Sequence, residues 1–162
     1  MPYMVLYDDF KKMTKDNRQK HPSSADKTGS ETSTQTKDSK VQVLVVDDDV
    51  KILRFISSSL RLAGYDVATA TSGEEALQLL ESKKPQIMVL DILMPQTDGF
   101  AVIRKLRPES KLPVIAISAH TSAAGQALSL GANAFLAKPF RPDELIKKIE
   151  ALLDHKGKQA AG

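Results

Sequence analysis

The 162-residue sequence contains no cysteine and no tryptophan, and aromatic residues make up only 5% of it. Without cysteine the chain has no disulfide, no thiolate metal ligand and no thiol nucleophile. No apolar run approaches the roughly 20 residues that a membrane-spanning helix needs. The first residues lack the basic start and long apolar core of a secretory signal. We therefore expect a cytoplasmic protein without a membrane partner.

Neither sign of charge predominates, because the formal net charge is only +3. Basic residues are spread over helix faces and the N-terminal tail and form no long basic block. A small, dispersed charge gives no sign of nucleic-acid binding. We therefore expect no nucleic-acid partner.

Residues 1–40 differ in composition from the rest of the chain. Between Thr14 and Lys40 the only apolar side chain is Ala25. Such a segment buries too little apolar area to offset the entropy of ordering it, which predicts disorder. It is either a solvated tail or a tether or docking arm. The folded domain is predicted over residues 41–155, followed by a short flexible tail over 156–162.

Five short apolar segments alternate with five segments of helical periodicity from residue 41 onward. The predicted strands are 43–46, 65–70, 87–90, 114–117 and 134–137. The predicted helices are 50–63, a capped helix from 72 that Pro85 stops, 99–106, 126–130 and 142–155. This alternation is typical of an α/β, doubly wound parallel sheet with helices on both faces. The flavodoxin-like strand order 2-1-3-4-5 is the common one at this size.

Polar side chains stand where four of these strands end. Asp47 and Asp48 follow the first strand, Asp91 the third, Ser118 the fourth and Lys138 the fifth. The carboxyl ends of parallel strands share one edge of the sheet, and ligands bind there at the switch point. We therefore expect three carboxylates, a hydroxyl and an ammonium to meet in one shallow cleft.

Three neighbouring carboxylates repel each other unless a cation is present. Oxygen ligands with one open side suit Mg²⁺, which can also bind a phosphate oxygen. A carboxylate can act as a nucleophile toward a phosphoryl group. By itself, the pair Asp47–Asp48 is more typical of a helix N-cap. Asp91 is not expected to cap a helix, because Pro95 and a turn at 97–99 follow it.

The region from about residue 41 to 153 resembles the receiver domain of bacterial two-component response regulators, the CheY-like family. The matching segments are Val45-Val46-Asp47-Asp48, Leu90-Asp91-Ile92-Leu93-Met94-Pro95 with Asp98-Gly99, Ser118-Ala119, Gly131-Ala132 and Lys138-Pro139-Phe140. Together they cover nearly the whole predicted domain, and the combination is highly specific.

The resemblance implies that Asp91 accepts a phosphoryl group from a sensor histidine kinase or a histidine phosphotransfer protein. It implies that Mg²⁺ is held by Asp47 or Asp48, by Asp91 and by the main-chain carbonyl of Leu93; in the family both acids of the pair contribute. Such a protein is a signalling phosphoacceptor and not an enzyme. Mg²⁺-dependent self-phosphorylation and slow autodephosphorylation are expected of it.

The resemblance also assigns residues to signal transmission. Ser118 would be the switch hydroxyl, Lys138 would pair with the phosphoryl group, and the Lys138–Pro139 peptide bond would be cis. Phe135 stands where the family has its switch aromatic, often Tyr, although it could simply belong to the core. The segment between Ser118 and Lys138 is about two residues shorter than usual, which predicts a short fourth helix. His120 is predicted to be a solvent-facing loop residue.

No effector domain follows Leu153, so we expect a stand-alone, single-domain regulator. It would signal by phosphorylation-dependent binding to an unknown protein target or by passing phosphate along a relay. One alternative is a haloacid-dehalogenase-type phosphatase that uses Asp47 or Asp49. Another is a phosphate-independent, receiver-like binding module. The identity of the phosphorylated aspartate separates the response regulator from the phosphatase.

Overall fold

A computed structural model describes residues 40–95 and 97–159, so most of the predicted N-terminal tail lies outside the described residues. The elements alternate along the chain as the sequence predicts. They are β1 (Gln42–Val46), α2 (Val50–Leu62), β2 (Asp66–Ala70), α3 (Gly73–Lys83), β3 (Ile87–Asp91), α4 (Gly99–Leu106), β4 (Val114–Ser118), α5 (Ala123–Ser129), β5 (Ala134–Ala137) and α6 (Pro142–Gln159).

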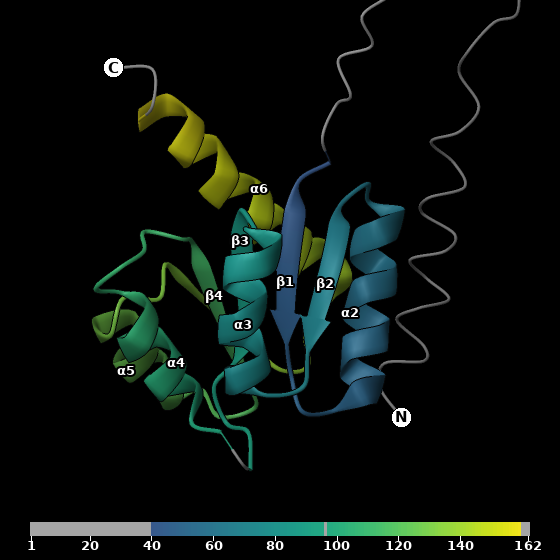
Figure 1. Ribbon diagram of the computed structural model, residues 1–162. Helices are drawn as coiled ribbons and strands as arrows, with labels where there is room; N and C mark the ends of the chain where they lie inside the picture. The colour runs from purple at the N-terminus through teal and green to yellow at the C-terminus, as the bar shows by residue number, and fades with distance from the viewer. Residues whose placement is uncertain (1–39, 96, 160–162) are drawn as a thin grey trace, which may run out of the picture. The chain divides into compact units, whose positions relative to one another are not determined.

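The five strands form one sheet in the order β2-β1-β3-β4-β5, and every neighbouring pair is parallel (Figure 1). The predicted fold class is therefore confirmed. Val46 is in register with Leu90, Asp91 with Ile117, and Ser118 with Ala137. The carboxyl ends of β1, β3, β4 and β5 consequently lie along one edge of the sheet.

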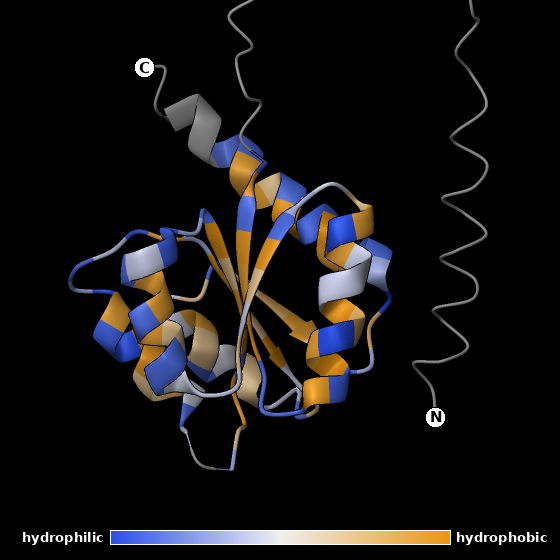
Figure 2. Ribbon diagram, turned by 45° about the vertical axis from the view of Figure 1, so that its right-hand side comes forward, coloured by the Kyte–Doolittle hydropathy of each residue, from blue (hydrophilic) through white to orange (hydrophobic). Residues whose placement is uncertain are grey.

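Two helical layers cover the sheet, with α3, α4 and α5 on one face and α2 and α6 on the other (Figure 1). The inner strands are apolar along their length, because side chains of both faces enter a core (Figure 2). Leu44, Val46, Met88 and Leu90 belong to the first core, and Val43, Val45, Ile87 and Val89 to the second. This explains why the strands are continuous apolar runs and do not alternate.

Two helices are longer than predicted. α5 begins at Ala123, three residues before the predicted start, because Ala123 is buried against the first core and Gly125 is tolerated on the exposed side. With seven residues α5 is nevertheless short, as expected. α6 continues to Gln159, four residues beyond its predicted end.

At two helix starts the sequence predicts side-chain contacts, namely a capping box over Ser72-Gly73-Glu74-Glu75 and the ion pairs Asp143–Lys147 and Glu144–Lys148. The Ser72 hydroxyl accepts from Glu75 N at 3.2 Å, but the Glu75 carboxylate accepts from Thr71 N at 2.7 Å, one residue before the N-cap. At α6, Asp143 pairs with Lys147 at 3.7 Å as expected. The predicted Glu144–Lys148 pair is wrong, because the Glu144 carboxylate accepts from Arg141 N at 2.7 Å.

None of the helices in the described part of the chain combines the length and the apolar character needed to cross a bilayer.

Candidate functional site

An acid cluster lies where β1 and β3 end. Asp47 is fully buried and Asp91 is 5% exposed, whereas Asp48 is exposed. Each of the three residues offers a carboxylate oxygen, and these oxygens lie within 4.8 Å of one another. The sheet thus brings together three of the side chains that the sequence places at strand ends.

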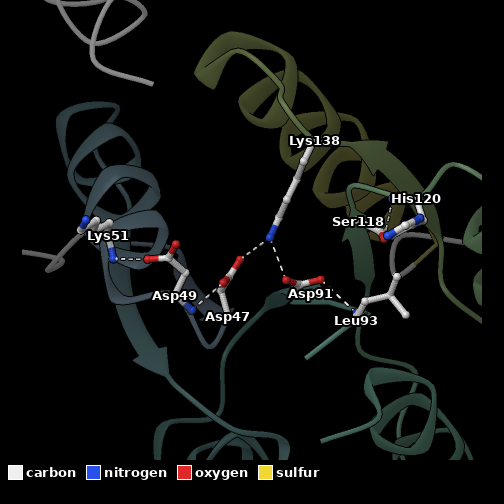
Figure 3. A network of polar contacts seen from close by, with 8 residues as sticks. All are labelled: Asp47, Asp49, Lys51, Asp91, Leu93, Ser118, His120 and Lys138. Carbon is white, nitrogen blue, oxygen red and sulfur yellow. Dashed lines mark hydrogen bonds and ion pairs between the residues drawn. The ribbon is translucent and has the colours of Figure 1, made fainter. Parts of the chain in front are cut away.

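Lys138 joins two of these acids directly (Figure 3). Its Nζ lies 2.6 Å from Asp47 Oδ2 and 2.7 Å from Asp91 Oδ2. The residue directly follows β5, and its main-chain N donates to Ser118 O at 2.8 Å, which ties it to the end of β4. The Lys138–Pro139 peptide bond is cis, as the resemblance implies.

The charges of Asp47, Asp91 and Lys138 together favour the binding of an additional cation. Burial would lower the pKa of the Lys138 ammonium, but its hydrogen bonds and charge interactions with Asp47 and Asp91 outweigh this effect and raise it. Burial raises the pKa of the Asp47 carboxyl, and Lys138 offsets this only in part. One ammonium shared by two desolvated carboxylates leaves a net negative charge, and Asp48 adds another.

The three consecutive acids after β1 have three different environments. Asp47 Oδ1 accepts from Asp49 N at 2.9 Å, which fixes the turn. Asp49 Oδ1 accepts from Lys51 N at 2.8 Å and caps α2. Asp48 lies between them and is exposed beside the other carboxylates. The cap is therefore Asp49 and not the pair Asp47–Asp48; its place immediately before the first helical residue was the signal that sequence reasoning overlooked.

The loop from β3 to α4 holds Asp91 from its other side. Asp91 Oδ1 accepts from Leu93 N at 3.1 Å, and Leu93 forms an isolated antiparallel bridge with Asp98. Asp98 Oδ1 accepts from Phe100 N at 2.9 Å and caps α4. Leu93 is 47% exposed, and its contact with Asp91 is made by its main-chain N.

Gly99 allows this loop to close tightly on β3. A Cβ at position 99 would lie 2.5 Å from Asp91 O and 2.6 Å from Ile92 Cα, and main-chain atoms cannot move aside as a flexible side chain can. We expect Gly99→Ala to lower the free energy of unfolding by about 2–3 kcal/mol, measured by urea denaturation.

Gly125→Ala is the matched control for that variant. No atom lies within 4 Å of a Cβ built at this helical position, so this change is expected to stabilise the protein by about 0.5–1 kcal/mol. Equal unfolding free energies for Gly99→Ala and the wild type would contradict the close approach.

Ser118 lies near the cluster but is bonded elsewhere. It is fully buried, and its Oγ accepts from His120 N at 3.0 Å (Figure 3). No hydrogen bond among the described residues joins its hydroxyl to Asp91 or Lys138. His120 is exposed, as expected, and Phe135 is half-buried against the first core.

The donor set of the cluster fits Mg²⁺. Carboxylate oxygens are hard ligands, the local charge is negative, and the exposed Asp48 leaves one side open to water. The residues that could hold the ion are Asp47, Asp48 and Asp91. The Leu93 carbonyl as a further ligand stays a prediction.

The family model of the response regulator receiver domain matches residues 43–150. The chain therefore belongs to the family of response regulator receiver domains, and its strand order and acid-rich sheet edge agree with this. Membership in this family argues against the phosphatase alternative. In the structure Asp49 caps α2 and Asp47 pairs with Lys138.

Individual relatives support the same conclusion. The chain is 42% identical over 116 residues to the probable transcriptional regulator ycf27 of Cyanophora paradoxa, covering 70% of this chain and 48% of that one. It is 42% identical over 122 residues to the transcriptional regulatory protein PrrA of Mycobacterium tuberculosis, covering 74% and 52%. The structure of the chemotaxis protein CheY4 of Vibrio cholerae matches with a TM-score of 0.66 and 31% identity, covering 69% and 98%.

These relatives overturn one expectation. The prediction that nucleic acid plays no part is contradicted, because the first two relatives are transcriptional regulators. The prediction rested on the charge of this sequence, and the chain spans about half the length of those relatives. The charge of the matched region carries no information about what the unmatched half of those relatives binds. The expectation of a stand-alone regulator stays a prediction.

Proposed function

We propose that the protein receives a phosphoryl group on Asp91 from a sensor histidine kinase or a histidine phosphotransfer protein. The observation that carries the proposal is the bridge of Lys138 between Asp47 and Asp91 at the edge of the acid cluster. An Asp91 oxygen would attack the phosphorus, and the bond to the donor's nitrogen would break. The donor histidine leaves with the bonding electrons, giving an aspartyl phosphate.

The neighbouring residues would stabilise charge on the transferred group. Asp47, Asp48, Asp91 and the Leu93 carbonyl would hold Mg²⁺, which when bound supplies positive charge to the phosphoryl oxygens. The Lys138 ammonium is already 2.7 Å from Asp91 Oδ2, so it is placed to neutralise the same oxygens. The Ser118 hydroxyl would leave its bond with His120 N and donate to the phosphoryl group.

The output of the domain would be a change in protein binding that depends on phosphorylation. Ser118 and Phe135 would transmit the state of Asp91 through β4, α5 and β5. Similarity to the transcriptional regulators ycf27 and PrrA supports an output that acts on transcription.

Intact mass spectrometry of the full chain after incubation with acetyl phosphate tests this function. We expect a gain of one phosphoryl group in the presence of Mg²⁺ and no gain when EDTA removes the metal, because the acid cluster then repels the anionic donor. A gain of the same size in EDTA would contradict the role of the metal. Absence of any gain would contradict phosphorylation by a small donor and favour the phosphate-independent module.

A further inference from the structure

The end of α4 carries an arginine that binds two loops at once. Arg107 Nε donates to Gly131 O at 2.8 Å, and Nη1 donates to Ser110 O at 3.1 Å and Leu112 O at 2.9 Å. Nη2 donates to Asn133 Oδ1 at 3.2 Å. All four acceptors are uncharged, so the guanidinium serves as a hydrogen-bonding hub. It lies at the edge of the sheet where the strands begin, opposite Asp91.

The loop that Arg107 holds directly follows α5 and is shaped for this contact. Gly131 has φ +107°, and a Cβ there would lie 2.8 Å from Arg107 Nε, so any larger residue would displace the guanidinium. Asn133 is fixed a second time, because its N donates to Val114 O at 2.8 Å and its Oδ1 accepts from Val114 N at 2.9 Å. The C-terminal end of α5 is thus fastened to α4 and β4.

The N-terminal end of α5, near Ser118, packs through Ala123, but among the described residues no side chain holds it by hydrogen bonds as Arg107 holds the other end. Ser122 makes no side-chain capping bond, and the first amides form short-range bonds, Ala123 N to His120 O and Ala124 N to Thr121 O, both at 3.1 Å. Ala123 and Ala127 are the only buried residues of the helix, and Gly125 weakens it further. The two ends of α5 therefore differ in how firmly they are held.

We infer that Arg107 is a positioning residue for the switch: it holds the C-terminal end of α5 in place, so that within 119–133 the response to phosphorylation is confined to residues 119–127. The inference rests on the proposed function. When Ser118 turns toward the phosphoryl group, it gives up its bond with His120 N, and the turn at 119–122 loses that support. The displacement passes into the weak start of α5 and ends at the loop held by Arg107.

Hydrogen exchange measured by mass spectrometry on the full chain tests this inference, with Mg²⁺ and with or without acetyl phosphate. An undeuterated aliquot of each sample gives the phosphorylated fraction. In the wild type we expect phosphorylation to change exchange in peptides from 119–127 and to leave 128–133 unchanged. In Arg107→Met the change is expected to extend through 128–133. Arg104→Met is the matched control, because Arg104 lies on the same helix and makes only an exposed ion pair with Asp98.

The quantity to compare is the last residue along the chain at which phosphorylation changes hydrogen exchange. A purely structural role of Arg107 would raise exchange equally in both states and leave that boundary in place. If phosphorylated Arg107→Met shows no change of exchange at 128–133, the inference is overturned. A change of exchange at 128–133 on phosphorylation of the wild type would also overturn it, and this measurement does not depend on a variant that folds. Arg107→Lys, expected to give an intermediate boundary, replaces Arg107→Met if the latter is unfolded. Failure of the wild type to gain phosphate in the undeuterated aliquot would overturn the proposed function and the inference with it.

Discussion

Asp91→Asn is expected to abolish the Mg²⁺-dependent gain of a phosphoryl group completely. The amide cannot form an acyl phosphate and contributes no negative charge to the metal site. The other two acids of the cluster are not expected to substitute, because Asp47 is fully buried against Lys138 and Asp48 lies outside the Lys138 bridge. Intact mass after incubation with acetyl phosphate measures this loss.

Two observations separate this loss from misfolding. Asp49→Asn is the matched control, because Asn caps a helix as well as Asp does and should leave both α2 and the phosphoryl gain intact. Asp91→Asn itself should unfold in Mg²⁺-free urea no more easily than the wild type, since it removes a carboxylate that repels Asp47. A phosphoryl gain that survives in Asp91→Asn would move the acceptor to the acids after β1.

Lys138→Met is expected to lower the free energy of unfolding by about 3–5 kcal/mol in the absence of Mg²⁺. The variant leaves Asp47 and Asp91 buried without their shared cation, and removal of one partner from a buried ion pair has a cost of this size. Met is chosen because it keeps most of the side-chain volume. Urea denaturation in the presence of EDTA measures the effect.

Lys147→Met is the matched control for the Lys138 variant. Lys147 is exposed and pairs with Asp143 at 3.7 Å, so its removal should cost less than about 0.5 kcal/mol. Added Mg²⁺ should raise the melting temperature of Lys138→Met more than that of the wild type, because the metal then meets a more negative site. Equal stability of Lys138→Met and the wild type in EDTA would show that Lys138 does not neutralise the buried acids.

The sheet and the meeting of its polar strand ends could be predicted from the sequence because both follow from periodicity and connection rules. Continuous apolar runs indicate strands buried on both faces, and parallel pairing places their ends at one edge. These rules bring Asp47 and Asp91 together, with Lys138 beside them, before any coordinate is known. They specify which residues meet but not which atoms bind.

The contacts that the sequence did not predict depend on tertiary neighbours. Asp49 rather than Asp47 or Asp48 caps α2, because it directly precedes Val50, and Asp47 instead pairs with Lys138. The Glu144 carboxylate accepts a hydrogen bond from Arg141 N and does not pair with Lys148. The network of Arg107 joins segments 24 and 26 residues apart, and no local pattern marks it. The Gly131 that it contacts ends a predicted helix and belongs to the Gly131-Ala132 segment of the resemblance, but neither feature indicates a contact with Arg107.

Locating the phosphoryl group on the chain tests most directly whether Asp91 is the acceptor. Borohydride reduces an acyl phosphate to an alcohol, so the modified aspartate becomes homoserine and can be placed by peptide mass spectrometry. The chain is incubated with acetyl phosphate and Mg²⁺, reduced and digested. We expect homoserine at position 91 and unmodified aspartate at 47, 48 and 49. Homoserine at any of those three positions, with Asp91 unchanged, would contradict this expectation.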